Sequence, residues 1–144
     1  NSVIMGYSNK AHDGYLGDSV IGEWCNMGAG TTNSNLKNNA GMVRVWTPKG
    51  ALHAGNKCGV MMGDYSRTAI NTSINTGTVI GVSCNVFGSG LTPKYIPSFS
   101  WGSDGVDRYD IEKAMVDIEG WKQLKGHSVT SAEKSILHYI FKHF

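Results

Sequence analysis

The 144-residue sequence is poor in charged residues, in proline and in long apolar runs. Charged residues make up 17% of the chain, below the roughly 25% of an average soluble domain. The net charge of +2 is too weak a field to indicate nucleic acid as a partner. No apolar run approaches the ~18 residues that a membrane-spanning helix needs, so we expect no insertion into a membrane.

Cysteine is also scarce, and its spacing is informative. Cys25, Cys58 and Cys84 are odd in number and include no C-x-x-C pair. This pattern disfavours both a disulfide framework and a structural zinc site. We therefore expect three reduced, buried thiols in a cytoplasmic protein. The chain starts at Asn1 without a secretion signal, so we also expect it to be a piece of a longer protein.

Glycine, in contrast, is abundant, with 19 residues against three prolines, which is typical of many tight turns between short strands. A six-residue repeat accompanies it: a mostly aliphatic residue recurs at every sixth position, and a small residue follows four positions later. The first set comprises Tyr15, Ile21, Met27, Met62, Thr68, Ile74, Ile80 and Val86. The second set comprises Ser19, Cys25, Thr31, Ser66, Thr72, Thr78, Cys84 and Gly90.

A period of six matches neither a helix, which repeats at 3.6, nor a single strand, which repeats at 2. It suits a prism with three short strands per coil, in which the aliphatic residue fills the interior and the small residue lies at a corner. The hexads therefore predict a mainly β fold, a parallel β-helix, directly over residues 15–33 and 62–90. An ordinary sandwich of short strands is the alternative.

The segments outside the hexads have patterns of their own. Residues 34–61 leave the register, which predicts a loop insertion with a short strand near 42–46 and a turn at 47–50. Such an insertion is either solvated decoration or a carrier of function. We accordingly expect a β-helix domain over residues 1–100 and a C-terminal helical cap over 101–144.

Two helices are predicted in the C-terminal tail. Apolar spacing indicates one over residues 107–124, and a capping box at 130–133 begins a second that runs to 144. We expect Ile136, Ile140 and Phe144 to share one stripe of the second helix, with Leu137 and Phe141 beside it. The helices should cover the open end of the coil stack, or else form a trimer-stabilising or partner surface.

The most specific pattern lies in residues 9–36, which read NKAHDGYLGDSVIGEWCNMGAGTTNSNL. This segment closely resembles the acetyltransferase half of the bifunctional N-acetylglucosamine-1-phosphate uridyltransferases, where G-H-x-x-Y-[LV]-G-D-x-x-I-G-x-x-x-N-x-G-A-G-T-x-x-x-N opens the active site. The resemblance implies a left-handed parallel β-helix, a homotrimer and a site between neighbouring subunits. Twelve positions match without a gap: His12, Tyr15, Gly17, Asp18, Ile21, Gly22, Asn26, Gly28, Ala29, Gly30, Thr31 and Asn35.

The same resemblance implies roles for individual residues in acetyl transfer. His12 would be the general base that accepts the proton of a sugar amine, a task that suits imidazole because its pKa lies near working pH. Tyr15 and Asn26 would hold the amino-sugar phosphate, and Asn35 would position the reacting groups.

Further positions concern acetyl-CoA, the co-substrate, and the substrate phosphate. Ala29 and Gly88 match positions that line the CoA groove of the family. A lysine that meets the phosphate there aligns with Gly41 here, and Lys37 could substitute for it from a different place. A serine that contacts the co-substrate in the family aligns with Ile70.

Three functions remain open at this point. The first is the acyltransferase domain of a sugar-nucleotide nucleotidyltransferase-like protein, acting on an amino-sugar phosphate in cell-envelope synthesis, with the nucleotidyltransferase domain upstream. The second is an inactive β-helix that serves as a trimerisation or sugar-nucleotide-binding module. The third, a carbonic anhydrase of the hexapeptide fold, needs three histidines to bind zinc, whereas only His12 and His53 lie in or beside the coils, so we expect no metal.

Overall fold

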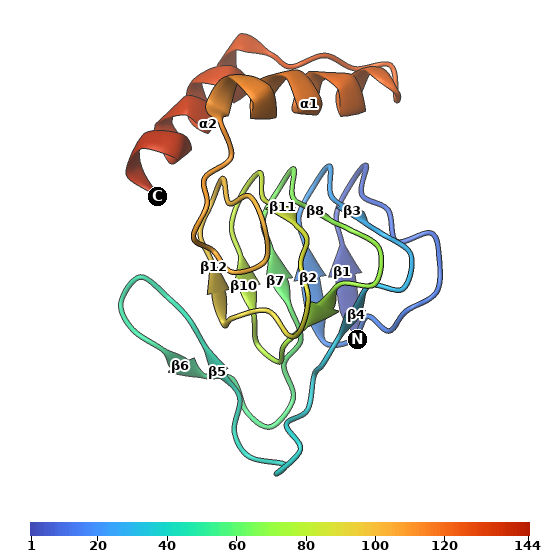
Figure 1. Cartoon of the computed structure of the whole chain (residues 1–144), viewed down its shortest axis with the longest axis vertical. Coiled ribbons are helices and arrows are strands. Elements are labelled where there is room, and N and C mark those ends of the chain that lie inside the picture. Colours follow the sequence, from blue (N-terminus) through green and yellow to red (C-terminus); the bar gives the residue numbers. More distant parts are fainter.

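Short parallel strands stack in register and form the three faces of a prism, as the hexads predict (Figure 1). The computed structural model describes residues 1–144. Sheet A contains β1 (Ser2–Ile4), β2 (Ser19–Ile21), β7 (Met61–Met62), β10 (Val79–Ile80) and β12 (Tyr95–Ile96). Sheet B contains β3 (Asn26–Met27), β8 (Arg67–Thr68) and β11 (Asn85–Val86), and sheet C contains β4 (Thr32–Asn33) and β9 (Ser73–Ile74). The fold is therefore mainly β, a parallel β-helix with a helical tail.

The interior of the prism is filled by the side chains of the repeat. Burial of this apolar surface is the main stabilising contribution of the β-helix. The three cysteines are buried and unpaired, as predicted, and burial raises the pKa of the Cys25 and Cys84 thiols to about 11. The main core comprises Ile21, Cys25, Met27, Val60, Met62, Ile74, Ile80, Cys84, Val86 and Ile96.

Tyr15, which opens the predicted register, departs from it. Its side chain is 52% exposed, and Leu16 packs against the core instead. The reason is that Ile4 pairs with Ile21 at a spacing of 17, whereas later coils, such as Met62 with Ile80, are spaced by 18. The missing residue falls between Leu16 and Ile21, which both face the core and are only five positions apart. Counting back six from Ile21 therefore reaches Tyr15, which points to the opposite face because side chains alternate along a strand.

At the corner between sheets A and B, each coil places one residue in the left-handed region. We call this set of five residues the aromatic corner, because four of its members are aromatic. The rings of its first two members stack with centroids 4.2 Å apart. Apart from Ser83, the set forms an apolar ridge along the side of the prism. Its members are Tyr7, Trp24, Tyr65, Ser83 and Phe99.

The helices α1 (Ile111–Gln123) and α2 (Ser131–His143) lie along this ridge, and they do not cover the open end of the stack (Figure 1). Lys125, just after α1, donates to the Tyr7 carbonyl in the first coil, while Phe99 in the last coil packs against Phe141 of α2. The ridge spans every coil and draws the helices to the side, because apolar surface there would otherwise face water. Neither helix has the length and hydrophobicity of a membrane span.

The second helix begins as predicted, with Thr130 and Glu133 forming a capping box. The predicted stripe is right for Ile140, which packs against the buried cluster, but wrong for Ile136 and Phe144, which are exposed, while Leu137 is the buried residue. Leu137 and Phe141 are four positions apart and share the face that meets the β-helix.

The insertion folds as a hairpin of β5 (Arg44–Val45) and β6 (Leu52–His53), antiparallel to each other, with the predicted turn after β5. It is attached to the β-helix, since Val43 is fully buried and Trp46 stacks on Tyr95 with centroids 3.6 Å apart. The insertion is therefore an ordered part of the structure beside sheet A.

Glu133 ties the second helix to both α1 and the coils. Its carboxylate accepts hydrogen bonds from the Tyr65 hydroxyl, the Lys122 ammonium and the Thr130 backbone N–H. Burial alone would raise the pKa of Glu133, but these donors outweigh it and lower the pKa from 4.5 to about 2. The ionised form thus holds the two helices together.

This network predicts acid-sensitive stability. A carboxyl whose pKa is lower in the folded state stabilises fully above its unfolded pKa, and that stabilisation is lost as pH falls toward about 2. When the pH falls from about 5 to 2, the free energy of unfolding measured in urea should decrease by ~2 kcal/mol more for the wild type than for Glu133→Gln. The exposed Glu112 is the matched control, and Glu112→Gln should follow the wild type. If the free energy of unfolding fell equally with pH in the wild type and in Glu133→Gln, Glu133 would not be the source of the acid sensitivity.

Candidate functional site

Sheet C is the face of the prism opposite the corner on which the two helices lie. The coil residues packed against the helices come from the aromatic corner and its surroundings in sheets A and B. The outward side chains of sheet C include Tyr15, whose carbonyl accepts from the Asn33 N–H, and Thr32 and Ser73, which pair across β4 and β9. Most of the residues that resemble the acetyltransferase motif lie on the two edges of this face.

The first edge is the corner between sheets B and C, and it carries His12. The loop of His12 is fixed on the next coil, because the Gly30 N–H donates to the Asp13 carbonyl at 3.1 Å. Lys10 Nζ also donates to the Asp13 carbonyl at 2.8 Å. The His12 ring is exposed and makes no hydrogen bond within the chain.

Ala29 and Gly88 lie further along the same corner, which we call the His12 edge (residues 10–14, 28–31, 69–72 and 87–90). Backbone bonds from Gly28 to Thr68 and from Ala69 to Val86 stack these turns coil upon coil. Ile70, 69% exposed, and the partly exposed Phe87 give the edge an apolar surface. Such a surface suits a long apolar group such as the pantetheine arm of CoA.

Two glycines keep the chain close at this edge. A Cβ on Gly28 would lie 2.6 Å from the backbone of Ala69 and Ile70, so a side chain there would force the coils apart. Gly88 has a φ of 151°, and its Cβ would meet the Ser103 hydroxyl. Close packing of the coils therefore requires glycine at position 28, and the backbone conformation together with Ser103 favours glycine at position 88.

The second edge is the corner between sheets C and A, where Tyr15, Asn35 and Asp18 form a polar cluster. The Asn35 amide donates to the Tyr15 hydroxyl at 3.0 Å and to Asp18 Oδ2 at 2.7 Å. The hydrogen bond from Asn35 is the main cause that lowers the pKa of Asp18, and the Asn1 amine and Lys57 add to it. The cluster therefore offers an ionised carboxylate and a phenol oxygen to a polar ligand. Sequence reasoning missed Asp18 as a site residue, although it was one of the matched positions.

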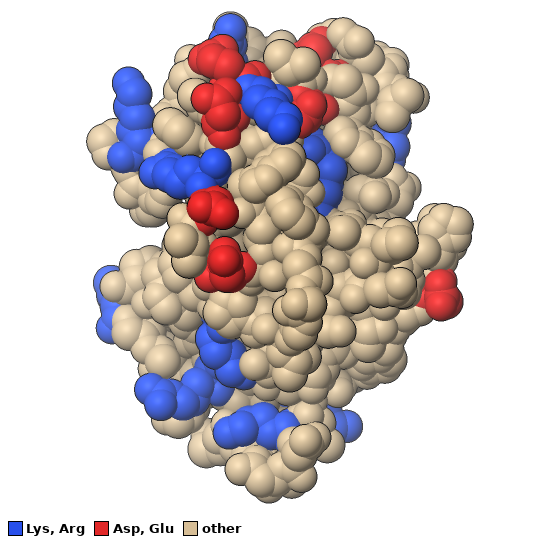
Figure 2. Space-filling view, in the orientation of Figure 1, with Lys and Arg blue, Asp and Glu red and all other residues tan.

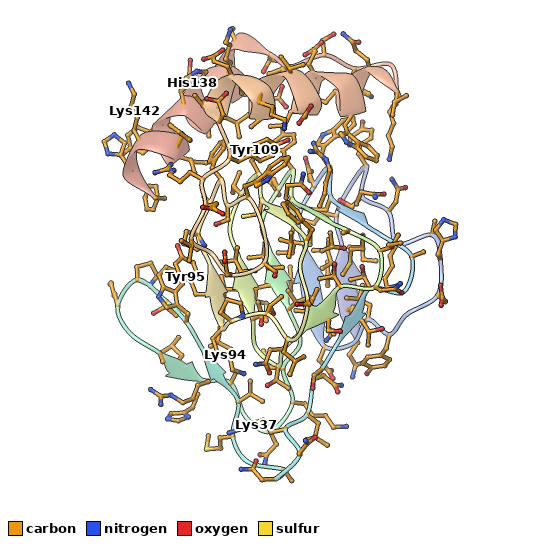
Figure 3. All side chains as sticks on the ribbon, viewed as in Figure 1. Lys37, Lys94, Tyr95, Tyr109, His138 and Lys142 are labelled. Carbon is orange, nitrogen blue, oxygen red and sulfur yellow. The ribbon has the colours of Figure 1, made fainter.

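Lys37 follows Asn35 by two residues and lines a groove of about 430 Å³ that also holds Lys94 (Figure 3). Lys94 Nζ donates to the carbonyl and the hydroxyl of Thr76, and burial, followed by the nearby Lys37, lowers the pKa of Lys94. In the view of Figure 2, the surface below the coils shows Lys and Arg but no Asp or Glu. Nothing in the sequence pattern singled out Lys94, because it follows the last hexad. The other lining residues are Ser34, Leu36, Asn38, Asn39, Asn75, Thr76 and Leu91.

Asn26 is the one predicted site residue that does not lie on sheet C or its edges. Met27 of the same strand is buried in the core, so Asn26 points outward from sheet B. Its register partner in the next coil is Arg67. The structure thus brings Tyr15, Asn35 and Lys37 to one edge of sheet C and His12, Ala29 and Gly88 to the other. No group of three or more His, Cys, Asp or Glu side chains in the chain could hold a metal ion.

No family model matches the chain, but several known proteins are similar to it in sequence. The "Bifunctional protein GlmU" of Methanocaldococcus jannaschii is 36% identical over 97 residues, which are 67% of this chain and 24% of the relative. The "Bifunctional sugar-1-phosphate nucleotidylyltransferase/acetyltransferase" of Sulfurisphaera tokodaii is 39% identical over 87 residues, 60% of this chain and 22% of the relative. The "Bifunctional protein GlmU" of Methanococcus aeolicus is 38% identical over 80 residues, which are 56% of this chain and 20% of the relative.

The chain therefore matches less than a quarter of the length of these curated relatives. All three names describe bifunctional proteins, and the name of the Sulfurisphaera protein gives the two activities as nucleotidylyl transfer to a sugar 1-phosphate and acetyl transfer. This similarity to part of the bifunctional nucleotidyltransferase/acetyltransferases confirms the resemblance identified from residues 9–36.

Proposed function

We propose that this chain is an acetyltransferase domain that transfers the acetyl group of acetyl-CoA to the amine of an amino-sugar phosphate. The observation that carries the proposal is the arrangement around sheet C. The exposed His12 ring lies on the same edge as Ala29, and the hydrogen-bonded cluster of Tyr15, Asn35 and Asp18 lies on the other edge. The names of the relatives support the class of reaction.

His12 would act as the general base. The amine nitrogen attacks the thioester carbonyl while the imidazole accepts the amine proton, which makes the nitrogen a better nucleophile. A C–N bond forms, the C–S bond breaks, and CoA leaves as a thiolate. The imidazolium then returns its proton to the thiolate or to water, which restores the free base.

The amino-sugar phosphate would lie against the second edge of sheet C. Tyr15 and Asp18 present oxygens to the sugar hydroxyls, while Asn35 fixes both of them. The groove of Lys37 and Lys94 supplies positive charge for the phosphate. Asn26, on the outer face of sheet B, would meet the sugar from a neighbouring subunit in a site shared between copies.

A homotrimer would supply that neighbour. The outward column of sheet A is apolar in all five strands, and two of its three valines, Val3 and Val20, are exposed. An apolar column of this kind favours burial between subunits. The column consists of Val3, Val20, Met61, Val79 and Tyr95.

A second candidate function is an inactive β-helix that binds a sugar nucleotide or holds a trimer together. Two positions favour it: Gly41 and Ile70 stand where the resembled family has a phosphate-binding lysine and a serine that contacts the co-substrate. In this reading the sugar phosphate still binds, but acetyl-CoA does not.

Calorimetry combined with a free-thiol assay separates the two functions. We expect saturable binding of acetyl-CoA and release of thiol only when glucosamine 1-phosphate is also present. Glucose 1-phosphate, which lacks the amine, should release no thiol and is the control ligand. Binding of sugar phosphate without any binding of acetyl-CoA would overturn the acetyltransferase proposal in favour of the inactive module.

A further inference from the structure

Arg67 is a buried charge, and two of its three guanidinium nitrogens have no hydrogen-bond partner. It lies on β8 and points outward from sheet B, yet it is only 9% exposed, because α1 covers it. Nε and Nη2 of its guanidinium are fully buried and have no partner, and neither ion pair of the chain includes it. The closest cover is the Trp121 ring of α1, whose centroid is 5.3 Å from Arg67 Cζ.

Arg67 is one wall of a groove of about 470 Å³ between sheet B and α1, which we call the Arg67 groove. Tyr109 lies between the helices and the coils (Figure 3), and its hydroxyl donates to Asp117. The Asp117 carboxylate is therefore engaged by Tyr109 and forms no ion pair with Arg67. The groove is lined by Arg67, Asn85, Tyr109, Val116, Asp117, Gly120, Trp121 and Leu124.

The electrostatics of the groove leave the guanidinium under-compensated. Burial lowers the pKa of Arg67, and the nearby Tyr109 and Asp117 offset only part of this effect. A buried cation without a hydrogen-bonded partner is destabilising, since water no longer solvates it. A planar guanidinium is also the group best matched to the oxygens of a phosphate or carboxylate.

We propose that the Arg67 groove binds a small phosphate or carboxylate anion, held by the guanidinium of Arg67. Asn85, the register partner of Arg67 on β11, contributes an amide to the same site. Because Nε and Nη2 are shielded, the bound anion displaces the half-buried Trp121 ring, so binding alters tryptophan emission. The anion is either a free small anion or the phosphate of the acceptor sugar, which would then lie here and not in the groove of Lys37 and Lys94. Asn26, proposed to meet the sugar, flanks Arg67 in register on the other side.

Thermal unfolding of the intact protein tests the site with inorganic phosphate as the probe. In about 20 mM phosphate, at ionic strength matched with chloride, the Tm of the wild type should rise by roughly 3 °C. Arg67→Met should raise the Tm in chloride by roughly 3 °C, because it removes the uncompensated charge, and should abolish the phosphate shift and the change in emission. Arg67→Lys should retain part of the shift. Arg44→Met, at an exposed arginine of the hairpin, is the matched control and should keep the full shift.

Two further arms identify the source of the anion. If glucosamine 1-phosphate still raises the Tm of Arg67→Met, the groove takes a free anion. If Arg67→Met loses this Tm shift together with the shift caused by inorganic phosphate, the groove takes the phosphate of the sugar. The proposal is overturned if Arg67→Met is less stable than the wild type in chloride and phosphate raises the Tm of both equally. No arm contains acetyl-CoA, so the result does not depend on acetyl transfer.

Discussion

Replacing His12 with alanine should lower the rate of acetyl transfer by roughly 10²–10⁴-fold and leave the binding of acetyl-CoA unchanged. The imidazole is exposed and makes no hydrogen bond, so its loss removes a proton acceptor without unsettling the coil beneath it. The rate is measured as release of free thiol with glucosamine 1-phosphate present, and the binding by calorimetry.

His53 provides the matched control for this experiment. It is an exposed histidine of β6 on the hairpin and takes no part in the proposed site, so His53→Ala should match the wild type in rate and in binding. Turnover of His12→Ala near that of the wild type would show that another group accepts the proton. Loss of acetyl-CoA binding in His12→Ala would instead assign His12 to binding.

Replacing Phe99 with alanine should have the largest effect on stability, lowering the free energy of unfolding by about 3–5 kcal/mol. Phe99 is fully buried, and its ring packs edge-to-face against Phe141 of α2. Its backbone also accepts from the Tyr109 N–H and donates to the Val82 carbonyl. Phe99 thus joins the helices to the coils, and the measurement is equilibrium unfolding in urea.

Phe144→Ala is the control, because Phe144 is exposed at the end of α2, and we expect a loss below about 1 kcal/mol. Hydrogen exchange adds a second measurement to the comparison. Amides of α1 and α2 should exchange faster in Phe99→Ala, while those of β7 and β10 should keep most of their protection. If Phe99→Ala lowered the free energy of unfolding as little as Phe144→Ala does, other residues would have to hold the helices on the coils.

The β-helix could be predicted because its inward positions follow a fixed period along the chain. Ile21, Met62 and Ile80 needed only a count of residues to be assigned to the core. Tyr15 was misplaced because the first coil is one residue shorter than the later ones, and a count across a loop cannot detect this. The position of the helices was also missed, since the aromatic corner consists of residues from separate coils.

The site could be predicted to the extent that its residues share one linear motif. His12, Tyr15 and Asn35 lie within a single segment, and the fold places them on the two edges of one face. Lys94 and Arg67 carry no such signal. Lys94 becomes notable only when a distant turn brings it to Lys37, and Arg67 only when α1 covers the strand on which it lies.

The insertion between β4 and β7 also influences the order in which the chain assembles. Strand β7 pairs with β10 at a separation of 18 residues, but with β2 at 41, because the hairpin intervenes. Closing the longer loop costs more chain entropy, although each doubling of loop length adds only about 0.6 kcal/mol. Coils before the hairpin and coils after it can therefore form by local pairing, each within its own stretch of chain. Joining these two short stacks is the non-local step of folding, and it completes sheet C, so the face that carries the site is created last.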